Sequence, residues 1–198
     1  MSETSTSQDP VSYYIDHTIY TGRPADTTDR LPKEIRTYDL LDSLGIAYAR
    51  ADHDTLPTME ACQEVGNLLG IEICKNLFLR NTQKTAFYLL ILPGRKKFKT
   101  AALSKQIGSA RLSFAEPEFM EQYLNITPGS VSVLGLMNDP ENKVRLLIDK
   151  DILKNHPYFG CHPCINTSSL KFRTEDLLNK ILPAIHHDYT MVDLPYAE

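Results

Sequence analysis

Cysteine is scarce in this sequence, and no hydrophobic run is long enough to cross a membrane. The four cysteines, Cys62, Cys74, Cys161 and Cys164, are irregularly spaced along 198 residues, and no signal peptide precedes them. This spacing excludes the disulfide framework of a small secreted domain and predicts a reducing, cytoplasmic location. The longest apolar run, residues 86–92, is far shorter than the roughly 20 residues that a membrane helix needs. We therefore expect a protein with no membrane partner.

An excess of positive charge is missing as well. The chain carries 21 Lys and Arg against 25 Asp and Glu, so its formal net charge is −4. A basic coating that would hold duplex DNA is thereby excluded, and any contact with nucleic acid must use a local patch. A hydrophobic content of 42% is nevertheless enough for a buried core, which excludes disorder throughout the chain.

The common catalytic motifs are also absent. There is no Gly-x-Ser-x-Gly, His-Glu-x-x-His, Gly-x-x-x-x-Gly-Lys or Gly-x-Gly-x-x-Gly sequence, so the usual hydrolase, kinase and dehydrogenase signatures do not apply. Cys161 and Cys164 form a Cys-x-x-Cys motif, but no second pair completes four metal ligands and no helix pattern follows to activate a thiol. We predict no cofactor and no metal site, with cysteine-based redox chemistry kept as an alternative.

What is present is an interleaved pattern of helices and strands. Residues 1–30 are rich in Ser, Thr and Asp without periodicity, and we interpret them as an N-terminal extension in which residues 11–15 can dock as a short strand or helix. Residues 31–198 are expected to form one domain. Predicted helices cover 32–44, 58–69, 100–107, 117–124 and 174–181, and predicted strands cover 77–79, 85–92, 131–134, 144–148, 170–172 and 190–192. This order predicts an α/β class of mixed α+β character, with a mixed sheet surrounded by helices.

One stretch carries charge of a single sign. Between Pro93 and Ala115 there is no carboxylate, and there are six cations: Arg95, Lys96, Lys97, Lys99, Lys105 and Arg111. Such a run is either a solvated face or, against an acidic background, an edge that contacts phosphates. Both interpretations stay open. The candidate contacts to a nucleic-acid backbone are Arg95, Lys96, Lys97, Lys99 and Arg111.

Two short segments place polar groups beside predicted strands. Lys75 stands at the start of an apolar strand, where burying its charge is costly unless an anion pairs with it or its ammonium reaches solvent. Pro128, Gly129 and Ser130 precede another predicted strand and form a turn whose N–H groups can face a ligand. Each segment alone is also compatible with an ordinary sheet edge or an ordinary turn.

Taken together, these segments resemble the YbaK/ProX family of free-standing prolyl-tRNA editing proteins, whose fold is also inserted into some bacterial prolyl-tRNA synthetases. The resemblance runs from about Lys33 to Leu194 and rests on short segments in a fixed order. They are residues 75–80 (KNLFLR), 110–115 (ARLSFA), 127–132 (TPGSVS), 138–139 (ND), 162–163 (HP), 166–167 (NT) and 192–194 (VDL). The resemblance is nearest to the branch that deacylates alanyl-tRNA(Pro), and it implies the editing-domain fold with a central, partly barrel-like sheet.

The resemblance also implies roles for individual residues. Lys75 matches the lysine that is the functional hallmark of the family, and residues 129–133 match the glycine loop that borders the aminoacyl group. The expected catalytic residues are Lys75, Gly129 and Ser130, and the expected substrate-binding residues are Asn76, Val131, Ser132, His162 and His53. His162 either shapes the pocket or is a hydrogen-bonded structural histidine. Where the family loop ends in proline this chain has Val133, which we expect to loosen the loop or to change the pocket size.

The activity implied by the resemblance is removal of alanine from mischarged tRNA(Pro), with prolyl-tRNA synthetase as a further candidate partner. Two other functions stay open. The chain can instead deacylate cysteinyl-tRNA(Pro), or it can be a binding or regulatory protein whose altered loop has lost catalysis. Because the chain is acidic overall, we expect its affinity for tRNA to be weak and sensitive to salt.

Overall fold

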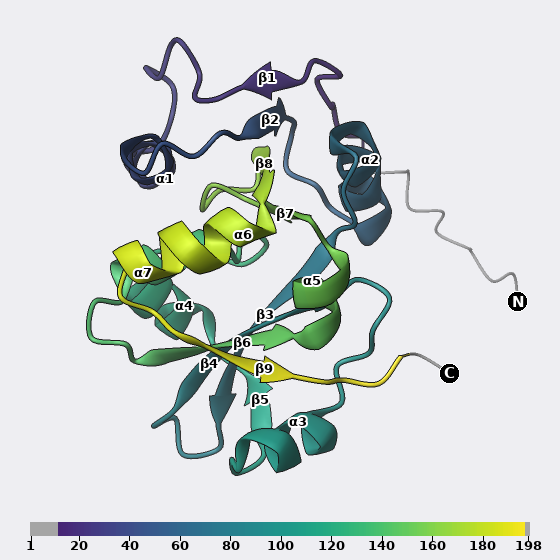
Figure 1. Ribbon diagram of the computed structural model, residues 1–198, viewed down its shortest axis with the longest axis vertical. Coiled ribbons are helices and arrows are strands. Elements are labelled where there is room, and N and C mark those ends of the chain that lie inside the picture. The colour runs from purple at the N-terminus through teal and green to yellow at the C-terminus, as the bar shows by residue number, and fades with distance from the viewer. Residues whose placement is uncertain (1–11, 197–198) are drawn as a thin grey trace, which may run out of the picture.

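The computed structural model describes residues 12–196, which form two β-sheets with helices packed around them (Figure 1). In chain order the elements are β1 (Tyr20–Thr21), α1 (Pro32–Ser43), β2 (Ala49–Asp52), α2 (Met59–Leu69), β3 (Cys74–Asn81), β4 (Phe87–Pro93), α3 (Thr100–Ile107), β5 (Leu112–Phe114), α4 (Pro117–Leu124), the 3₁₀ helix η1 (Val133–Asn138), β6 (Val144–Asp149), α5 (Lys150–Asn155), β7 (Tyr158–Cys161), β8 (Ser168–Arg173), α6 (Thr174–Asp176), the π-helical turn η2 (Leu177–Ile181), α7 (Leu182–Ala184) and β9 (Tyr189–Val192).

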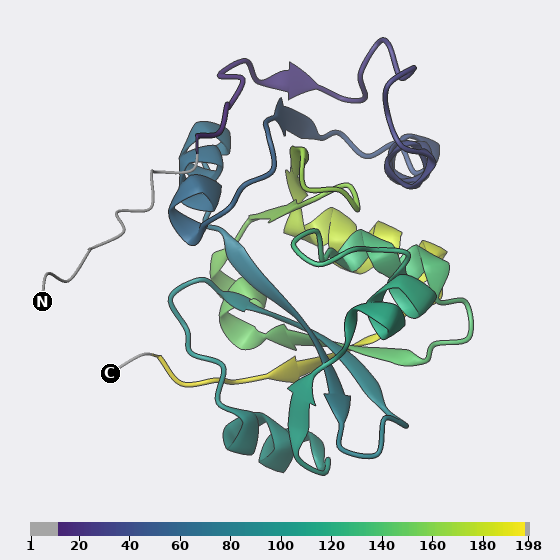
Figure 2. The ribbon, with the colours of Figure 1, turned by 180° about the vertical axis from the view of Figure 1, so that it is seen from behind.

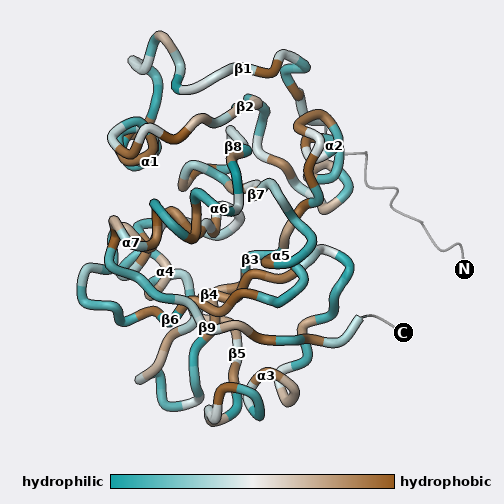
Figure 3. The backbone as a smooth tube through the Cα atoms, in the orientation of Figure 1, coloured by the Kyte–Doolittle hydropathy of each residue, from teal (hydrophilic) through white to brown (hydrophobic). Residues whose placement is uncertain are grey.

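The larger sheet has five strands in the order β5-β3-β4-β6-β9. The pairs β3–β4 and β3–β5 are antiparallel, whereas β4–β6 and β6–β9 are parallel, so the sheet is mixed as the sequence predicts. Every residue of the central strand β4 is buried, because both faces of the sheet are covered there. The continuous apolar run of that strand colours the middle of the sheet as hydrophobic in Figure 3.

The smaller sheet, in the order β1-β2-β8-β7, is antiparallel throughout. The sequence does not predict a separate second sheet, because β2 reads ARAD and β7 reads YFGC, neither of which alternates apolar with polar residues. The predicted mixed α/β class is confirmed. The partly barrel-like closure is not confirmed, since the strands pair as two sheets with separate edges.

Apolar side chains cover both faces of the larger sheet. On one face Phe78 and Leu89 pack with residues of α1, α4 and η2, such as Leu41, Leu124 and Ile181. On the other face a smaller cluster joins the sheet to α3 and to the segment after β9. Figure 2 views the molecule from behind, where α4 and β5 lie toward the viewer and α3 closes one end.

The predicted strand over residues 131–134 is wrong. Residues 133–138 form the helix η1 instead, because the Oγ of Ser132 accepts a hydrogen bond from the N–H of Leu134 and starts the helix as its N-cap. The apolar residues of this segment, Val133, Leu134 and Leu136, are buried in either conformation, so their hydrophobicity alone did not distinguish helix from strand.

The described part of the N-terminal segment lies against the fold. Ile15 forms an isolated antiparallel bridge with His53 and is buried beside Ala51 and Leu56. Val11, the first residue of the segment predicted to dock, lies outside the described residues. The boundary between an extension and a domain at residue 30 stays a prediction. None of the helices in residues 12–196 combines the length and the apolarity that spanning a bilayer requires.

Candidate active site

A cavity of about 240 Å³ is lined by residues from the start of β3, from α2, and from β7 and β8 of the smaller sheet. Five of the eight predicted catalytic and substrate-binding residues line it together: Lys75, Asn76, Gly129, Val131 and His162. The rest of the wall is mostly apolar, with Met59 and Cys62 from α2 and Ile71 and Ile73 from the connection to β3. Segments more than 80 residues apart in the chain therefore meet at one hollow.

Lys75 reaches this position because it is the second residue of β3, opposite Leu92 near the end of β4. Its Nζ donates a hydrogen bond to the backbone carbonyl of Lys96, 2.8 Å away, in the turn that follows β4. Within residues 12–196 no carboxylate lies within ion-pairing distance of Lys75, so its positive charge is not neutralised by the protein. A phosphate or a developing oxyanion in the cavity can take that role.

The loop before η1 supplies backbone donors. Gly129 has a φ of +88°, which a side chain would strain, and a Cβ at this position would stand 3.4 Å from the Nδ2 of Asn166. The N–H groups of Gly129 and Val131 have no hydrogen-bond partner among the described residues, although both residues line the cavity. The N–H of Ser130, by contrast, donates to the carbonyl of Thr127. The loop therefore leaves two amide donors for a ligand.

His162 offers an acceptor to the same cavity. Its Nδ1 lies 2.7 Å from the carbonyl oxygen of Ser168, and because a carbonyl only accepts, Nδ1 carries the proton. Nε2 is then the unprotonated nitrogen, and it has no partner among residues 12–196. Burial above all, together with the neighbouring His53 ring, lowers the pKa of His162 to about 4, although the hydrogen bond to Ser168 acts in the opposite direction. At neutral pH His162 is therefore an uncharged proton acceptor.

Three predicted residues do not line this cavity. His53 stands behind His162, with ring centroids 5.9 Å apart, and its Nε2 lies 2.9 Å from the Oγ of Ser169, which does line the cavity. Ser130 faces a neighbouring, more polar cavity of about 480 Å³, and its Oγ donates to the carbonyl of Thr127. Ser132 donates to the carbonyl of His162 at 2.6 Å. The hydroxyls of Ser130 and Ser132 thus hold the loop in place.

The thiols of the site are in their unreactive form. Burial raises the pKa of Cys74 to about 12 and raises that of Cys161 as well, so both are protonated at neutral pH. Cys164, the other half of the Cys-x-x-Cys motif, is also buried, with a pKa raised to about 12. All four cysteines are free, and we find no cluster of potential metal ligands within the described residues. These environments disfavour the redox alternative.

The cationic stretch does not act as one surface. The prediction that Lys96 contacts a nucleic-acid backbone is wrong. Its side chain is 1% exposed, and its Nζ pairs with Asp149 at 2.8 Å and with Asp151 at 2.9 Å, so it cannot reach a phosphate. Burial alone would lower the pKa of Lys96, but the two aspartates outweigh this effect and raise it. The pairing could not be foreseen because the carboxylates lie more than 50 residues away in the sequence.

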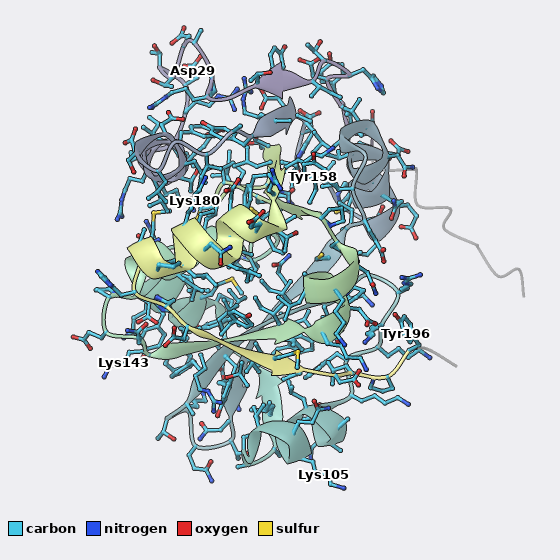
Figure 4. All side chains as sticks on the ribbon, in the orientation of Figure 1. Asp29, Lys105, Lys143, Tyr158, Lys180 and Tyr196 are labelled. Atoms are coloured by element: carbon cyan, nitrogen blue, oxygen red, sulfur yellow. The ribbon has the colours of Figure 1, made fainter. Side chains whose placement is uncertain are left out.

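The other cations divide between two places. Arg95, Lys97 and Lys99 are exposed in the turn beside Lys75, and Arg95 approaches Glu72 at 3.4 Å. Arg111 precedes the residue that pairs with Asn81 at the far end of β3, about 20 Å from Lys75 along the strand. Lys105 lies in the last turn of α3, at the end of the molecule labelled in Figure 4. None of these cations is among the residues that line the cavity, but the first group flanks Lys96, whose carbonyl accepts the hydrogen bond from Lys75.

Some features of the cavity wall have no signal in the sequence. Ile71 and Gly160 both line the cavity, and a Cβ built on Gly160 would stand 2.1 Å from the Cδ1 of Ile71. The Oδ1 of Asn76 is buried without a hydrogen-bond partner in the described structure. No local pattern marks these positions, because their importance arises from contacts between distant segments.

Comparison with known proteins identifies the family. Residues 53–180 match the family model of the aminoacyl-tRNA editing domain. The chain belongs to this family. The prolyl-tRNA editing protein ProX of Acetoanaerobium sticklandii is 32% identical over 154 residues, which span 78% of this chain and 93% of ProX. The prolyl-tRNA synthetase associated domain-containing protein 1 of Bos taurus is 28% identical over 142 residues, or 70% of this chain and 82% of that protein.

Solved structures confirm the editing-domain fold. The crystal structure of a candidate trans-editing enzyme for prolyl-tRNA synthetase superimposes with a TM-score of 0.60 at 17% identity, covering 84% of this chain and 99% of the other. As a member of the aminoacyl-tRNA editing family, the protein is an aminoacyl-tRNA deacylase, a hydrolase of the ester between an amino acid and its tRNA.

Proposed function

We propose that this protein is a trans-editing enzyme that hydrolyses alanyl-tRNA(Pro), releasing alanine and free tRNA(Pro). The observation that carries the proposal is the meeting of Lys75, Gly129 and His162 at one small cavity with mostly apolar walls. The name of the ProX relative supports tRNA(Pro) as the RNA. The names of the relatives also support prolyl-tRNA synthetase as a partner, which brings mischarged tRNA to the site.

Hydrolysis of an aminoacyl ester needs little chemical machinery, because the ester is already reactive. Water adds to the carbonyl carbon, the bond to the 3′ oxygen of the terminal adenosine breaks, and that oxygen takes up the proton that water gives up. In this site Lys75 and the N–H groups of Gly129 and Val131 stabilise the oxyanion or hold the terminal phosphate. The neutral Nε2 of His162, or the terminal 2′-hydroxyl, carries the proton from water to the leaving oxygen.

The apolar walls of the cavity suit a small apolar side chain. The methyl group of alanine can lie among Ile71, Ile73 and Met59, which line the cavity. A difference of one methylene in a pocket is worth only about 1–3 kcal/mol, so rejection of prolyl-tRNA(Pro) requires a steric clash. Cysteine is close to alanine in size, and the relative rates on the two esters decide between them.

The test is deacylation by the purified full chain of alanyl-, cysteinyl-, seryl- and prolyl-tRNA(Pro). We expect the alanyl ester to be hydrolysed fastest and the prolyl ester to be spared. Faster hydrolysis of the cysteinyl ester would replace alanine by cysteine in the proposal. Turnover of none of the four esters would instead favour a binding or regulatory protein.

The lysine is tested by Lys75→Ala in the same assay. We expect kcat/KM for alanyl-tRNA(Pro) to fall by about 100-fold or more, because the variant loses the charge that faces the reacting ester. Lys143→Ala removes an exposed lysine remote from the cavity and is the matched control. The melting temperature of Lys75→Ala should stay near that of wild type, and full activity in this variant would remove Lys75 from the mechanism.

A further inference from the structure

Two phenylalanines from separate elements meet on the surface of the larger sheet. Phe98 lies in the connection from β4 to α3, and Phe114 is the last residue of β5; both segments adjoin α3 at one end of the molecule (Figure 2). Their ring centroids are 5.7 Å apart with an edge-to-face angle of 60°. Phe114 is 61% exposed, so most of a large apolar ring faces solvent. The pair therefore presents an exposed aromatic face on which a flat ring can stack.

This aromatic pair is continuous with the cavity. Phe114 pairs with Leu79 of β3. Every second side chain of a strand points to the same face, so Leu79, Leu77 and Lys75 share one face of β3. Leu77 lines the cavity and also packs against the apolar cluster to which Phe98 belongs. Lys75 and Leu79 are about 13 Å apart along β3. Leu79 itself is fully buried, so a flexible chain that ends in the cavity can pass from the partly exposed Leu77 over Phe98 to Phe114.

The charge around the pair suits an anionic ligand. Lys97 and Lys99 flank Phe98, are exposed, and form no ion pair within residues 12–196. The nearest acidic residue in sequence to Phe114, Glu116, is already held by Arg80 at 2.8 Å and Lys84 at 2.7 Å. Flat aromatic faces between uncompensated cations are the pattern with which proteins bind single-stranded nucleic acid.

We propose that Phe98 and Phe114 form a stacking platform for the unpaired nucleotides that precede the aminoacylated adenosine of the tRNA. The base of one such nucleotide stacks on the ring of Phe114, and Lys97 and Lys99 contact the phosphates on either side. This inference rests on the proposed function, because the tRNA is the occupant of the platform. It assigns recognition of the single strand to a surface outside the cavity.

The experiment compares Phe114→Ala with Tyr189→Ala, a matched control that removes an exposed aromatic from the other edge strand of the same sheet. Binding is measured by fluorescence anisotropy with a labelled oligoribonucleotide that ends in CCA. We expect Phe114→Ala to weaken this binding about tenfold and Tyr189→Ala to leave it unchanged. Phe114→Tyr, which keeps a flat ring, should bind as wild type does, whereas Phe114→Leu should not.

Deacylation separates the platform from the cavity. For alanyl-tRNA(Pro), kcat/KM of Phe114→Ala should fall about tenfold through KM, whereas the alanyl ester of adenosine alone should be hydrolysed at the wild-type rate. Three results would overturn the inference: no binding of the oligonucleotide to wild type, equal binding to wild type and Phe114→Ala, or full rescue by Phe114→Leu, which would indicate a protein partner. If wild type hydrolyses neither ester, the proposed function fails. The difference in oligonucleotide affinity between wild type and Phe114→Ala still decides whether the stacking platform exists.

Discussion

A single hydrogen bond fixes the proton of His162 at the scale of one residue. Because Nδ1 donates to the carbonyl of Ser168, the ring stays neutral until its Nε2 is protonated, and burial makes that unfavourable down to about pH 4. The same bond explains why the alternatives considered for His162 are not exclusive. One nitrogen has a structural partner, and the other remains for the ligand.

The stability of the protein should therefore depend on His162 in acid. The histidine is protonated near pH 6.5 in the unfolded chain but only near pH 4 in the folded one, so between these values the unfolded state binds more protons. Stability falls as the pH drops from 6.5 toward 4, by about 2–3 kcal/mol from this group. In urea unfolding at pH 7 and pH 4.5, His162→Asn should lose less stability than wild type; an equal loss would contradict the lowered pKa.

The helix η1 decides how the loop is held at the scale of one element. The sequence has Val133 where the resemblance implies a proline, and for that reason it predicts a looser loop or a changed pocket size. In the structure Val133 is the first residue of η1, where proline is favoured because its missing N–H has no helical partner. Ser132 has φ −145° and ψ 145°, the extended conformation that precedes a proline.

Val133→Pro should accordingly be tolerated. The N–H of Val133 has no partner among the described residues, so the substitution removes no hydrogen bond, and we expect a gain in unfolding free energy of about 0.4–1 kcal/mol. Leu134→Pro is the matched control one position later. It breaks the bond from the Leu134 N–H to the Ser132 Oγ, and it should lower the melting temperature and the deacylation rate. A drop in melting temperature for Val133→Pro would show that this residue needs its N–H.

Most of the elements could be predicted because their signals are local. Thr58 caps α2 with its side chain, Pro117 stands at the start of α4, and the apolar runs of β3 and β4 form the expected hairpin. Lys75 and the loop at Gly129 line the same cavity, in agreement with the expectation that these two segments border one site. Lys96 was misjudged because only the folded chain brings aspartates to it. Phe114 was overlooked because exposure of an apolar residue has no sequence signal.

At the scale of the whole molecule, the buried Lys96 connects β6, α5 and the segment after β9 through ion pairs and hydrogen bonds. Its ammonium pairs with Asp149 at the end of β6 and Asp151 in α5, while the N–H of Leu194 donates to Asp149 and the hydroxyl of Tyr196 donates to Asp151. The backbone carbonyl of the same lysine holds the Nζ of Lys75. The segment after β9, which ends at the labelled Tyr196 in Figure 4, is thus tied to the turn whose carbonyl accepts the hydrogen bond from Lys75.

Removing this cation should destabilise the fold. Lys96→Met leaves the buried Asp149 without its charged partner, and we expect a loss of about 3–5 kcal/mol in unfolding free energy measured with urea. The control, Lys97→Met, changes the exposed neighbour and should alter stability by less than about 0.5 kcal/mol. Equal stability of the two variants would mean that the aspartates find other partners.

The glycine at position 160 controls how much room the amino acid finds. Gly160 stands so close to Ile71 that even one added carbon must displace the end of that flexible side chain, and both residues belong to the cavity wall. Gly160→Ala would therefore push Ile71 inward and narrow the hollow without touching Lys75, Gly129 or His162. A residue that takes no part in the chemistry can therefore change which amino acids the cavity accepts. Evolution can alter the preferred size of the acyl group in this way without changing the residues proposed to carry out hydrolysis.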